Sequence, residues 1–276
     1  MSVNASIVLY HTKKEDLERV LNSLKKNKLI NKVFLIDNSS NKELEKFSLF
    51  WEKIVYIFTG KNLGYGKGHN IALRESLKEG VKYHLVMNPD VYFEENVVDK
   101  LYEYMEENKD VGLSIPKVLN SDGSLQYACK LLPTPIDLIF RRFFNFKPFN
   151  SLVEKRNYFY ELRFYDYSKP FEAPFISGAF MFIRVDVLKE VGLFDERYFL
   201  YCDDLDLSRR VYKVSKNVCL TDICVYHKWS RGSYKSLKLL YYHIKDAIVY
   251  FNKWGWFKDE ERSLINKKVL KNLGRI

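Results

Sequence analysis

The chain has 276 residues, of which 47% are hydrophobic and 16% aromatic, and this composition excludes a disordered protein, a collagen-like repeat and a disulfide scaffold. Its length suits one globular domain and at most two. Lys and Arg number 45 against 35 Asp and Glu, a net charge of +10. Such a surface should attract polyanions, anionic lipid headgroups or phosphorylated small molecules, and charge alone does not choose among them.

The cysteines and the N-terminus indicate the compartment. The four cysteines are spaced too irregularly for a disulfide framework or a paired zinc site, so we expect reduced thiols in a cytoplasmic protein. The N-terminal segment reaches its charged residues before the apolar core of a signal peptide could form. No stretch offers about 18 uninterrupted apolar residues, so we expect neither a cleaved signal nor a membrane-spanning helix.

Strand and helix patterns alternate in the first hundred residues. Short β-branched and aromatic runs predict buried strands at Ser6–Tyr10, Val33–Asp37, Ile54–Phe58 and His84–Met87. Helical spacing of apolar residues predicts helices at Lys13–Asn27, His69–Lys78 and Val97–Glu107. This alternation predicts an α/β fold with a mostly parallel open sheet flanked by helices. Ligands of such sheets bind beyond the carboxyl ends of the strands.

The pattern changes after Pro116. The run Asn120–Gly123 indicates a turn, and residues 133–167, crowded with Phe, Tyr and Arg, predict an irregular flap. The remaining elements that we expect are a strand at Phe175–Arg184, helices at Val185–Val191 and Leu205–Val214, a strand over Val218–Tyr226 that ends at His227, and a long amphipathic helix at Lys235–Trp256.

Asp37 ends an apolar strand in VFLIDNSS, at the edge where ligands of an α/β sheet bind. Its carboxylate could accept hydrogen bonds from a ribose hydroxyl or from a base N–H. It could equally cap a helix that starts near Asn41, and the local sequence leaves both interpretations open.

Three glycines lie in NLGYGKGHN, residues Asn62–Asn70, just before a predicted helix, where they would let the backbone approach a diphosphate. The G-x-G-x-G spacing matches neither the Rossmann fingerprint nor the Walker loop. Taken alone, the segment favours an ordinary glycine-rich turn.

The tetrapeptide MNPD, Met87–Asp90, places a carboxamide and a carboxylate at a strand end. Oxygen ligands of this kind suit magnesium or manganese between diphosphate oxygens. Asn-Pro-Asp is also a common turn sequence, and the isolated motif is more often a turn than a ligand.

Acidic residues gather between aromatics in FDERYFLYCDDLDLSRR, residues Phe194–Arg210. Capping of a helix explains one of them, but a general base better explains the adjacent pair Asp203 and Asp204. His227 ends a strand in VYHKWSRGS. A lone histidine is usually structural, yet one beside Trp229 and Arg231 is placed to bind a metal or a phosphate.

In order and spacing, seven segments resemble the family 2 glycosyltransferases of the A-type fold, especially their bacterial rhamnosyltransferase-like branch: IVLYH, VFLIDNSS, NLGYGKGHN, MNPD, FISGAFMFIR, FDERYFLYCDDLDLSRR and VYHKWSRGS. The resemblance extends from about Ser6 to Ser233. It implies a nucleotide-diphospho-sugar transferase (GT-A) domain over residues 1–233, with a donor-binding half at 1–116. The acceptor-binding and catalytic half would be 117–233, including the flap at 133–167, and residues 234–276 would be an amphipathic helical extension.

The resemblance also implies roles in donor binding. On its pattern Asp37 matches the acid that reads the nucleoside, and Tyr10 and His11 match the strand-end residues beside the base. The loop under the ribose and diphosphate corresponds to Asn62, Gly64 and Asn70.

The metal site and the catalytic base follow from the same pattern. Asp90 matches the last carboxylate of the family's D-x-D motif, while Asn88 replaces its first Asp, which weakens the implied Mg²⁺ or Mn²⁺ site. His227 matches a histidine that joins the metal or the diphosphate, helped by Arg231. Asp204 occupies the slot of the catalytic base, and an inverting transfer is implied.

The expected partners are a dTDP- or UDP-linked donor of rhamnose or another hexose, and a glycan or lipid-linked acceptor of bacterial surface polysaccharide synthesis. Aromatic and basic residues at 138–144 and 237–256 suit peripheral contact with the inner face of the plasma membrane. They could equally pack on the core or form a homodimer contact.

Two rival functions are weaker. A sugar nucleotidyltransferase would need a Gly-rich, Arg-containing loop after the first strand, which LYHTKKED lacks. A non-catalytic adaptor that binds nucleic acid or membrane would not explain the acidic residues at the strand ends. We therefore expect no nucleic-acid partner.

Overall fold

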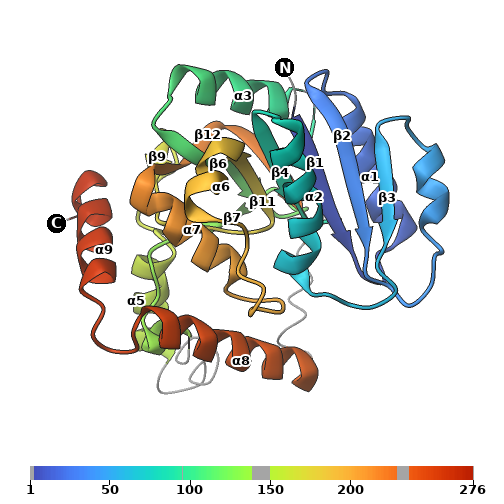
Figure 1. Cartoon of the computed structure of the whole chain (residues 1–276). Helices are drawn as coiled ribbons and strands as arrows, with labels where there is room; N and C mark the ends of the chain where they lie inside the picture. Colours follow the sequence, from blue (N-terminus) through green and yellow to red (C-terminus); the bar gives the residue numbers. More distant parts are fainter. Residues whose placement is uncertain (1–2, 95, 139–149, 229–235, 276) are drawn as a thin grey trace.

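The computed structural model of the chain describes residues 3–94, 96–138, 150–228 and 236–275. Within them a ten-stranded sheet has the order β3-β2-β1-β4-β11-β6-β12-β5, with two short strands attached at its side (Figure 1). Its first four strands are β1 (Val3–Leu9), β2 (Ile30–Asp37), β3 (Ile54–Phe58) and β4 (Tyr83–Met87). They are mutually parallel, and the four strands predicted for this half are confirmed.

The second half continues the same sheet. Its strands are β5 (Val91–Tyr92), β6 (Val111–Leu119), β11 (Phe180–Arg184) and β12 (Lys216–His227). Strand β11 is antiparallel to both β4 and β6, whereas β12 is parallel to β6. Strands β4, β6 and β12 therefore run in one direction, and the expected mostly parallel α/β sheet is confirmed.

Helices lie on both faces of the sheet (Figure 1). They are α1 (Lys14–Lys25), α2 (Tyr65–Glu79), α3 (Val97–Glu107), α5 (Asn150–Tyr160), α6 (Val185–Val191), α7 (Asp203–Val214), α8 (Leu237–Trp254), α9 (Glu260–Asn272) and the short 3-10 helix η1 (Glu45–Leu49). The apolar face predicted for α1 is fully buried, because Leu17, Val20, Leu21 and Leu24 have no exposed surface. Among the described residues, no helix is both long and apolar enough to cross a membrane.

The second half of the chain differs from the sequence analysis in three places. Strand β6 was missed, because Pro116 lies inside it and prolines usually mark the end of a strand. The expected strand Phe175–Arg184 is split: β10 (Phe175–Ile176) pairs with β8 (Cys129–Lys130), and only β11 joins the main sheet. The expected irregular flap contains the regular helix α5, of which Val153 and Tyr160 are buried; residues 139–149 of the flap lie outside the described part.

Short strands complete the edge of the sheet. Strand β7 (Leu125–Gln126) pairs with β6, and β9 (Phe171–Glu172) pairs with β12. The turn predicted at Asn120–Gly123 is confirmed, since the Gly123 N–H donates to the Asn120 carbonyl at 2.9 Å.

The C-terminal helices hold α7 through a buried ion pair. The Arg209 guanidinium donates to both carboxylate oxygens of Asp259, at 2.7 and 2.8 Å, and its carbon lies 4.1 Å from the centre of the Trp254 ring. The side chains of Arg209 and Asp259 are only 1% and 3% exposed. Helix α9, which the sequence analysis did not predict, is thereby tied to the sheet through α7.

We expect Arg209→Ala to lower the free energy of unfolding by about 3–5 kcal/mol, because it leaves the buried Asp259 carboxylate without its bidentate partner. Urea unfolding followed by circular dichroism measures this change. Lys189→Ala is the control: it removes an ion pair whose side chains are 60% and 75% exposed, and it should cost about 0–1 kcal/mol. An equal decrease in the free energy of unfolding in the two variants would contradict the stabilising role of the Arg209–Asp259 ion pair.

Candidate active site

Most of the predicted site residues follow the ends of strands that run in the same direction. Strands β1, β2, β4 and β12 all end at one edge of the sheet, which we call the carboxyl edge. Helices α2 and α7 begin there. The sequence positions Tyr10, Asp37, Asn88 and His227 are therefore brought to one side of the molecule, as predicted for an α/β sheet.

Tyr10 and His11 leave β1 at this edge. The Tyr10 ring is 48% exposed and meets the His11 ring edge-on, with 4.4 Å between ring centres. The backbone of His11 has a φ of 51°, a left-handed value that is uncommon outside glycine. Its N–H donates to Ser39 Oγ at 3.1 Å, which ties the end of β1 to the turn after β2.

Asp37 is buried beneath this surface, with no exposed area. The Ser39 N–H donates to its Oδ1 at 2.9 Å, and the Tyr56 hydroxyl donates to its Oδ2 at 2.6 Å. The helix-cap interpretation is wrong, because no helix begins near Asn41 and η1 starts only at Glu45, without a side-chain cap. Contact of Asp37 with a nucleoside stays a prediction.

The glycine-rich segment differs from the expected loop. Helix α2 begins at Tyr65, so Gly66 and Gly68 lie inside it, and only Gly64 precedes it, with a φ of 88°. A Cβ on Gly64 would lie 2.2 Å from the Phe199 carbonyl oxygen, and one on Gly66 would lie 2.8 Å from Phe194 Cβ. The glycines thus allow α2 to pack closely against the segment that leads to α7.

Two asparagines lie near the start of α2, one before it and one within it. Asn62 is exposed, and its Oδ1 accepts the Gly64 N–H at 2.9 Å. Asn70 is buried, and its amide exchanges hydrogen bonds with the Phe194 backbone at 2.9 and 3.0 Å. Asn70 therefore fastens α2 to the neighbouring loop, and its contact with a donor stays a prediction.

The implied metal ligands meet where β5 pairs with the end of β12. Val91 is in register with His227, which brings Asp90 Oδ1 to 3.4 Å from His227 Nε2. Asn88 Nδ2 lies 3.4 Å from the same nitrogen. Pro89 and Asp90 form the turn between β4 and β5, so the turn interpretation of MNPD is confirmed, and metal binding by its oxygen atoms stays a prediction.

Gln126 sets the orientation of the His227 ring. The Gln126 amide group donates to the His227 carbonyl at 2.9 Å, which turns Gln126 Oε1 toward His227 Nδ1 at 3.0 Å. Because this oxygen only accepts, Nδ1 carries the proton, and in the neutral ring Nε2 is an acceptor that the Asn88 amide N–H faces at 3.4 Å. Metal-binding histidines are usually held in this way.

A divalent cation fits this pair. A carboxylate and a neutral imidazole nitrogen are ligands that manganese and related divalent ions accept. Within the described ranges, no three His, Cys, Asp or Glu side chains gather in a metal-binding arrangement. Metal binding by Asp90 and His227 therefore stays a prediction. Arg231 lies outside the described residues.

The adjacent carboxylates begin α7. Asp203 is 2% exposed, and its Oδ2 accepts the Gly66 N–H at 2.9 Å, so it joins the first turns of α7 and α2. Asp204 is half-buried; its Oδ2 accepts the Gly178 N–H and its Oδ1 the Leu205 N–H, both at 2.8 Å. Of the two acidic residues, Asp204 is the more exposed.

The electrostatics favour proton uptake by this pair. Burial raises the pKa of Asp204 above its usual value of 3.8, although the hydrogen bonds from Gly178 and Leu205 oppose the shift. Burial, followed by the charge of Asp204, raises the pKa of Asp203 as well. The preceding residue, Cys202, has a φ of 62°, a strained backbone value at the start of the helix.

The sequence analysis missed Asp246, which positions the segment before α7. This carboxylate of α8 has no exposed surface and accepts the N–H groups of Phe199, Leu200 and Tyr201 at 2.9–3.2 Å. The Phe199 carbonyl in turn accepts the Tyr65 N–H at 2.8 Å. The sequence does contain a feature that singles out this residue, because Asp246 is the only acid in the run Leu237–Trp254.

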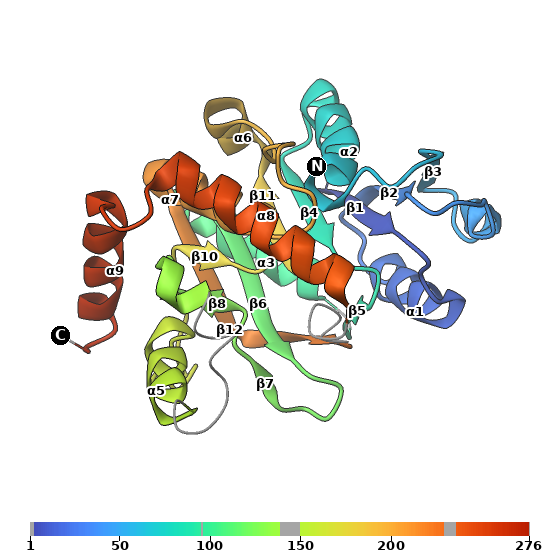
Figure 2. The same ribbon diagram turned by 90° about the horizontal axis from the view of Figure 1, so that it is seen from below.

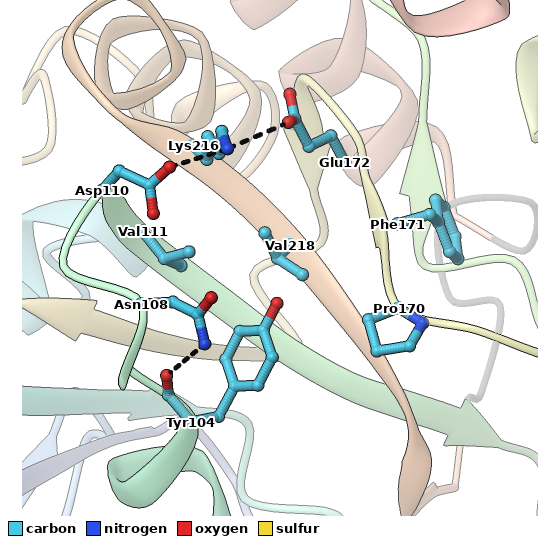
Figure 3. A pocket seen from close by; sticks show the side chains of 9 residues that line it. All are labelled: Tyr104, Asn108, Asp110, Val111, Pro170, Phe171, Glu172, Lys216 and Val218. Atoms are coloured by element: carbon cyan, nitrogen blue, oxygen red, sulfur yellow. Dashed lines mark hydrogen bonds and ion pairs between the residues drawn. The ribbon is translucent and has the colours of Figure 1, made fainter. Parts of the chain in front are cut away.

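A separate pocket of about 170 Å³ opens at the far side of the sheet (Figure 3). It lies beside the starts of β6 and β12, where Lys216 pairs with Asp110 at 2.7 Å and with Glu172 at 3.7 Å. This is the edge opposite the carboxyl edge, so the pocket does not belong to the candidate site.

We expect Asp246→Ala to speed amide hydrogen exchange at residues 199–201 by about 10–100-fold, because a hydrogen bond to a charged group contributes about 1.5–3 kcal/mol. Exchange measured by mass spectrometry reports this, with protection in β1 as the internal reference. Lys245→Ala changes the exposed neighbour and should leave the segment protected. Unchanged exchange in Asp246→Ala would show that this carboxylate does not hold the segment.

Comparisons with known proteins bear on this site. The chain is 26% identical over 214 residues to the low-salt glycan biosynthesis hexosyltransferase Agl10 of Haloferax volcanii, covering 77% of this chain and 63% of that protein. It is 26% identical over 196 residues to the N-acetylglucosaminyl-diphospho-decaprenol L-rhamnosyltransferase of Mycobacterium tuberculosis, covering 66% and 61%. The chain thus spans about three-fifths of these two relatives. With the rhamnosyltransferase WbbL of Escherichia coli it shares 23% identity over 274 residues, 96% of this chain and 94% of that one.

Solved structures share the fold. The structure of GalNAc-T7 with UDP, GalNAc and Mn²⁺ superposes with a TM-score of 0.60 at 15% identity, covering 83% of this chain and 44% of that one. The structure of Staphylococcus aureus TarS residues 1–349 with UDP gives a TM-score of 0.57 at 17% identity, covering 98% and 71%. Residues 6–192, more than half of the chain, match the family model for glycosyl transferase family 2. The protein therefore belongs to glycosyl transferase family 2 and has the GT-A fold.

Proposed function

We propose that this glycosyltransferase moves rhamnose or another hexose from a dTDP- or UDP-linked donor to a hydroxyl of a glycan or lipid-linked acceptor, with inversion at the anomeric carbon. One observation supports this most. The Asp204 carboxylate accepts the Gly178 N–H at 2.8 Å, and the next residue, Ala179, accepts the Asn88 N–H at 3.0 Å. The candidate base and Asn88, which lies beside the candidate metal pair, are therefore bonded to adjacent residues of one short segment.

Asp204 would act as the general base. It is partly exposed at the carboxyl edge, and its raised pKa makes it a stronger proton acceptor than an ordinary aspartate. It would take the proton of the acceptor hydroxyl while that oxygen attacks the anomeric carbon from the face opposite the leaving nucleoside diphosphate. Asp203, buried and bonded to Gly66, would keep the start of α7 in place.

Asp90 and His227 would hold a divalent cation, Mg²⁺ or Mn²⁺, which when bound would offset the charge of the departing diphosphate. The two side chains leave most of the coordination shell to donor oxygens, and the carboxamide of Asn88 supplies a hydrogen-bond donor beside them. Arg231 is proposed to add positive charge here. The GalNAc-T7 structure, which contains UDP and Mn²⁺, supports this arrangement by analogy of fold.

The nucleoside is proposed to lie at the ends of β1 and β2. The exposed rings of Tyr10 and His11 offer a stacking surface, with Asp37 beneath and Asn62 and Gly64 beside it. Two relatives are named rhamnosyltransferases, and the name of one specifies a diphospho-decaprenol acceptor. Because of these names, our first choice for the donor sugar is rhamnose, and our first choice for the acceptor is a lipid-linked molecule of surface polysaccharide synthesis.

The proposed compartment is the cytoplasm, with peripheral contact at the inner face of the plasma membrane. Its support is that all four cysteines are free thiols, three of them buried.

Membership of glycosyl transferase family 2 favours glycosyl transfer over the alternative reaction, nucleotidyl transfer.

We expect Asp204→Asn to lower the rate of sugar transfer by about 10²–10⁴-fold, because it removes the general base. A panel of nucleotide sugars, assayed by release of the nucleoside diphosphate, first identifies the donor. Thermal shift with UDP and dTDP in the presence of Mn²⁺ should show that the variant still binds the nucleotide.

Asp186→Asn, which changes an acid with a 75% exposed side chain on α6, is the matched control and should retain wild-type activity. Wild-type turnover in Asp204→Asn would refute the base assignment. A wild-type protein that hydrolyses or transfers no sugar from any donor would refute the proposed reaction.

A further inference from the structure

Helix α8 has two unlike faces. Its inner face carries Asp246 and Tyr250, which have no exposed surface and pack against the segment before α7. Its outer face carries an apolar stripe whose members are 86%, 61%, 42% and 43% exposed: Leu237, Tyr241, Ile244 and Ile248. Their spacing of four, three and four residues places them in one row along the helix.

The sequence left open whether the aromatic residues of this region pack on the core or face a membrane. The structure separates these aromatic residues into a group that packs on the core and a group that is exposed. Tyr242 stacks on Phe199 with 4.2 Å between ring centres, and Tyr250 is fully buried, whereas Tyr241 points outward with the stripe. Packing on the core therefore accounts for the inner face, and among the described residues the outer stripe stays exposed.

Charge indicates what would cover the stripe. Lys238 and Lys245 are exposed beside it, and the only acid between Leu237 and Lys258 is Asp246, which is buried on the other face. Just past the helix, Trp256 and Phe257 are 36% and 80% exposed, and Lys258 is exposed next to them. An apolar row flanked by lysines, with no exposed carboxylate in residues 237–258, matches the headgroup boundary of an anionic bilayer.

A second copy of the chain fits this surface less well. Two such faces laid together would bring the lysines of one face to the lysines of the other, with no exposed acid from residues 237–258 to pair with them. An anionic lipid surface supplies the missing negative charge and accepts the apolar row at the same time.

The position of α8 links this surface to the candidate site. Figure 2 shows the helix crossing in front of the sheet, on the side where α2 and α7 begin. Asp246 binds the three N–H groups at Phe199–Tyr201, close before Asp203 and Asp204 in the chain. A bilayer in contact with the outer face would therefore lie near the carboxyl edge.

We propose that the outer face of α8, together with Trp256 and Phe257, docks onto an anionic lipid bilayer and turns the carboxyl edge toward it. The consequence for catalysis rests on the proposed function: a lipid-linked acceptor would then reach Asp204 from the membrane surface. Docking itself rests only on the exposed residues of α8 and its end.

Vesicle flotation of the whole chain tests the docking. We expect binding to vesicles of phosphatidylglycerol and phosphatidylcholine at low salt, and weaker binding at high salt or to phosphatidylcholine alone. The double variant I244E/I248E should lose at least tenfold in binding without a change in melting temperature, because both side chains are already exposed. The control Leu264→Glu changes an apolar residue of α9 that is 69% exposed, and it should bind as the wild type does.

Two further readouts separate the possible failures. Light scattering on a sizing column detects a dimer: a wild-type dimer that I244E/I248E converts to a monomer, without vesicle binding, would overturn the proposal in favour of a second copy. Equal flotation of wild type and I244E/I248E would also overturn it. Hydrolysis of the nucleotide sugar by I244E/I248E should stay at the wild-type rate, so a failed docking test is distinguishable from a failed function.

Discussion

The candidate site depends on one hydrogen bond between two helix starts. The Asp203 carboxylate on the first turn of α7 accepts the Gly66 N–H on the first turn of α2, at 2.9 Å. The N–H groups of the two helix starts partly offset the burial that raises the pKa of this carboxyl group. The close approach explains why glycine occupies positions 64 and 66, since a Cβ at either would overlap the neighbouring segment. Asp203 joins the two helices, and Asp204, the more exposed of the two acids, is the proposed general base.

The C-terminal helices complete this arrangement, although they lie beyond the region that matches the family. Asp246 holds the backbone before α7, and Arg209 fixes α7 itself to Asp259 and Trp254. Helix α8 thus supports the candidate base from its inner face and presents an apolar, basic surface on its outer face. The same element can couple the position of the base to contact with a membrane.

Much of the fold could be predicted from the sequence, because buried strands and amphipathic helices have periodic apolar patterns. Helix α3, Val97–Glu107, agrees with its predicted bounds for this reason. Strand β6 was missed because Pro116 contradicts the local signal, and only pairing with β11 and β12 makes that segment a strand. The glycines of α2 were misread as a loop because helix propensity argues against them, whereas tertiary packing requires them. The meeting of Asp90 and His227 followed from the strand-end rule, but the support from Gln126 depends on side-chain geometry that no local pattern encodes. For Asp246 the sequence offers only a single acid in a long amphipathic helix, which does not identify its partners.

A crystal structure of the protein with Mn²⁺ and UDP or dTDP tests the central claim most directly. The account predicts a metal ion bound by Asp90 and His227, the diphosphate beside Asn88, the nucleoside against Tyr10 and His11, and an open space between the diphosphate and Asp204 that can hold a sugar. A nucleotide bound away from the carboxyl edge, for example in the pocket beside Lys216, would contradict it. So would a bound diphosphate that Asp204 could not approach across one sugar ring.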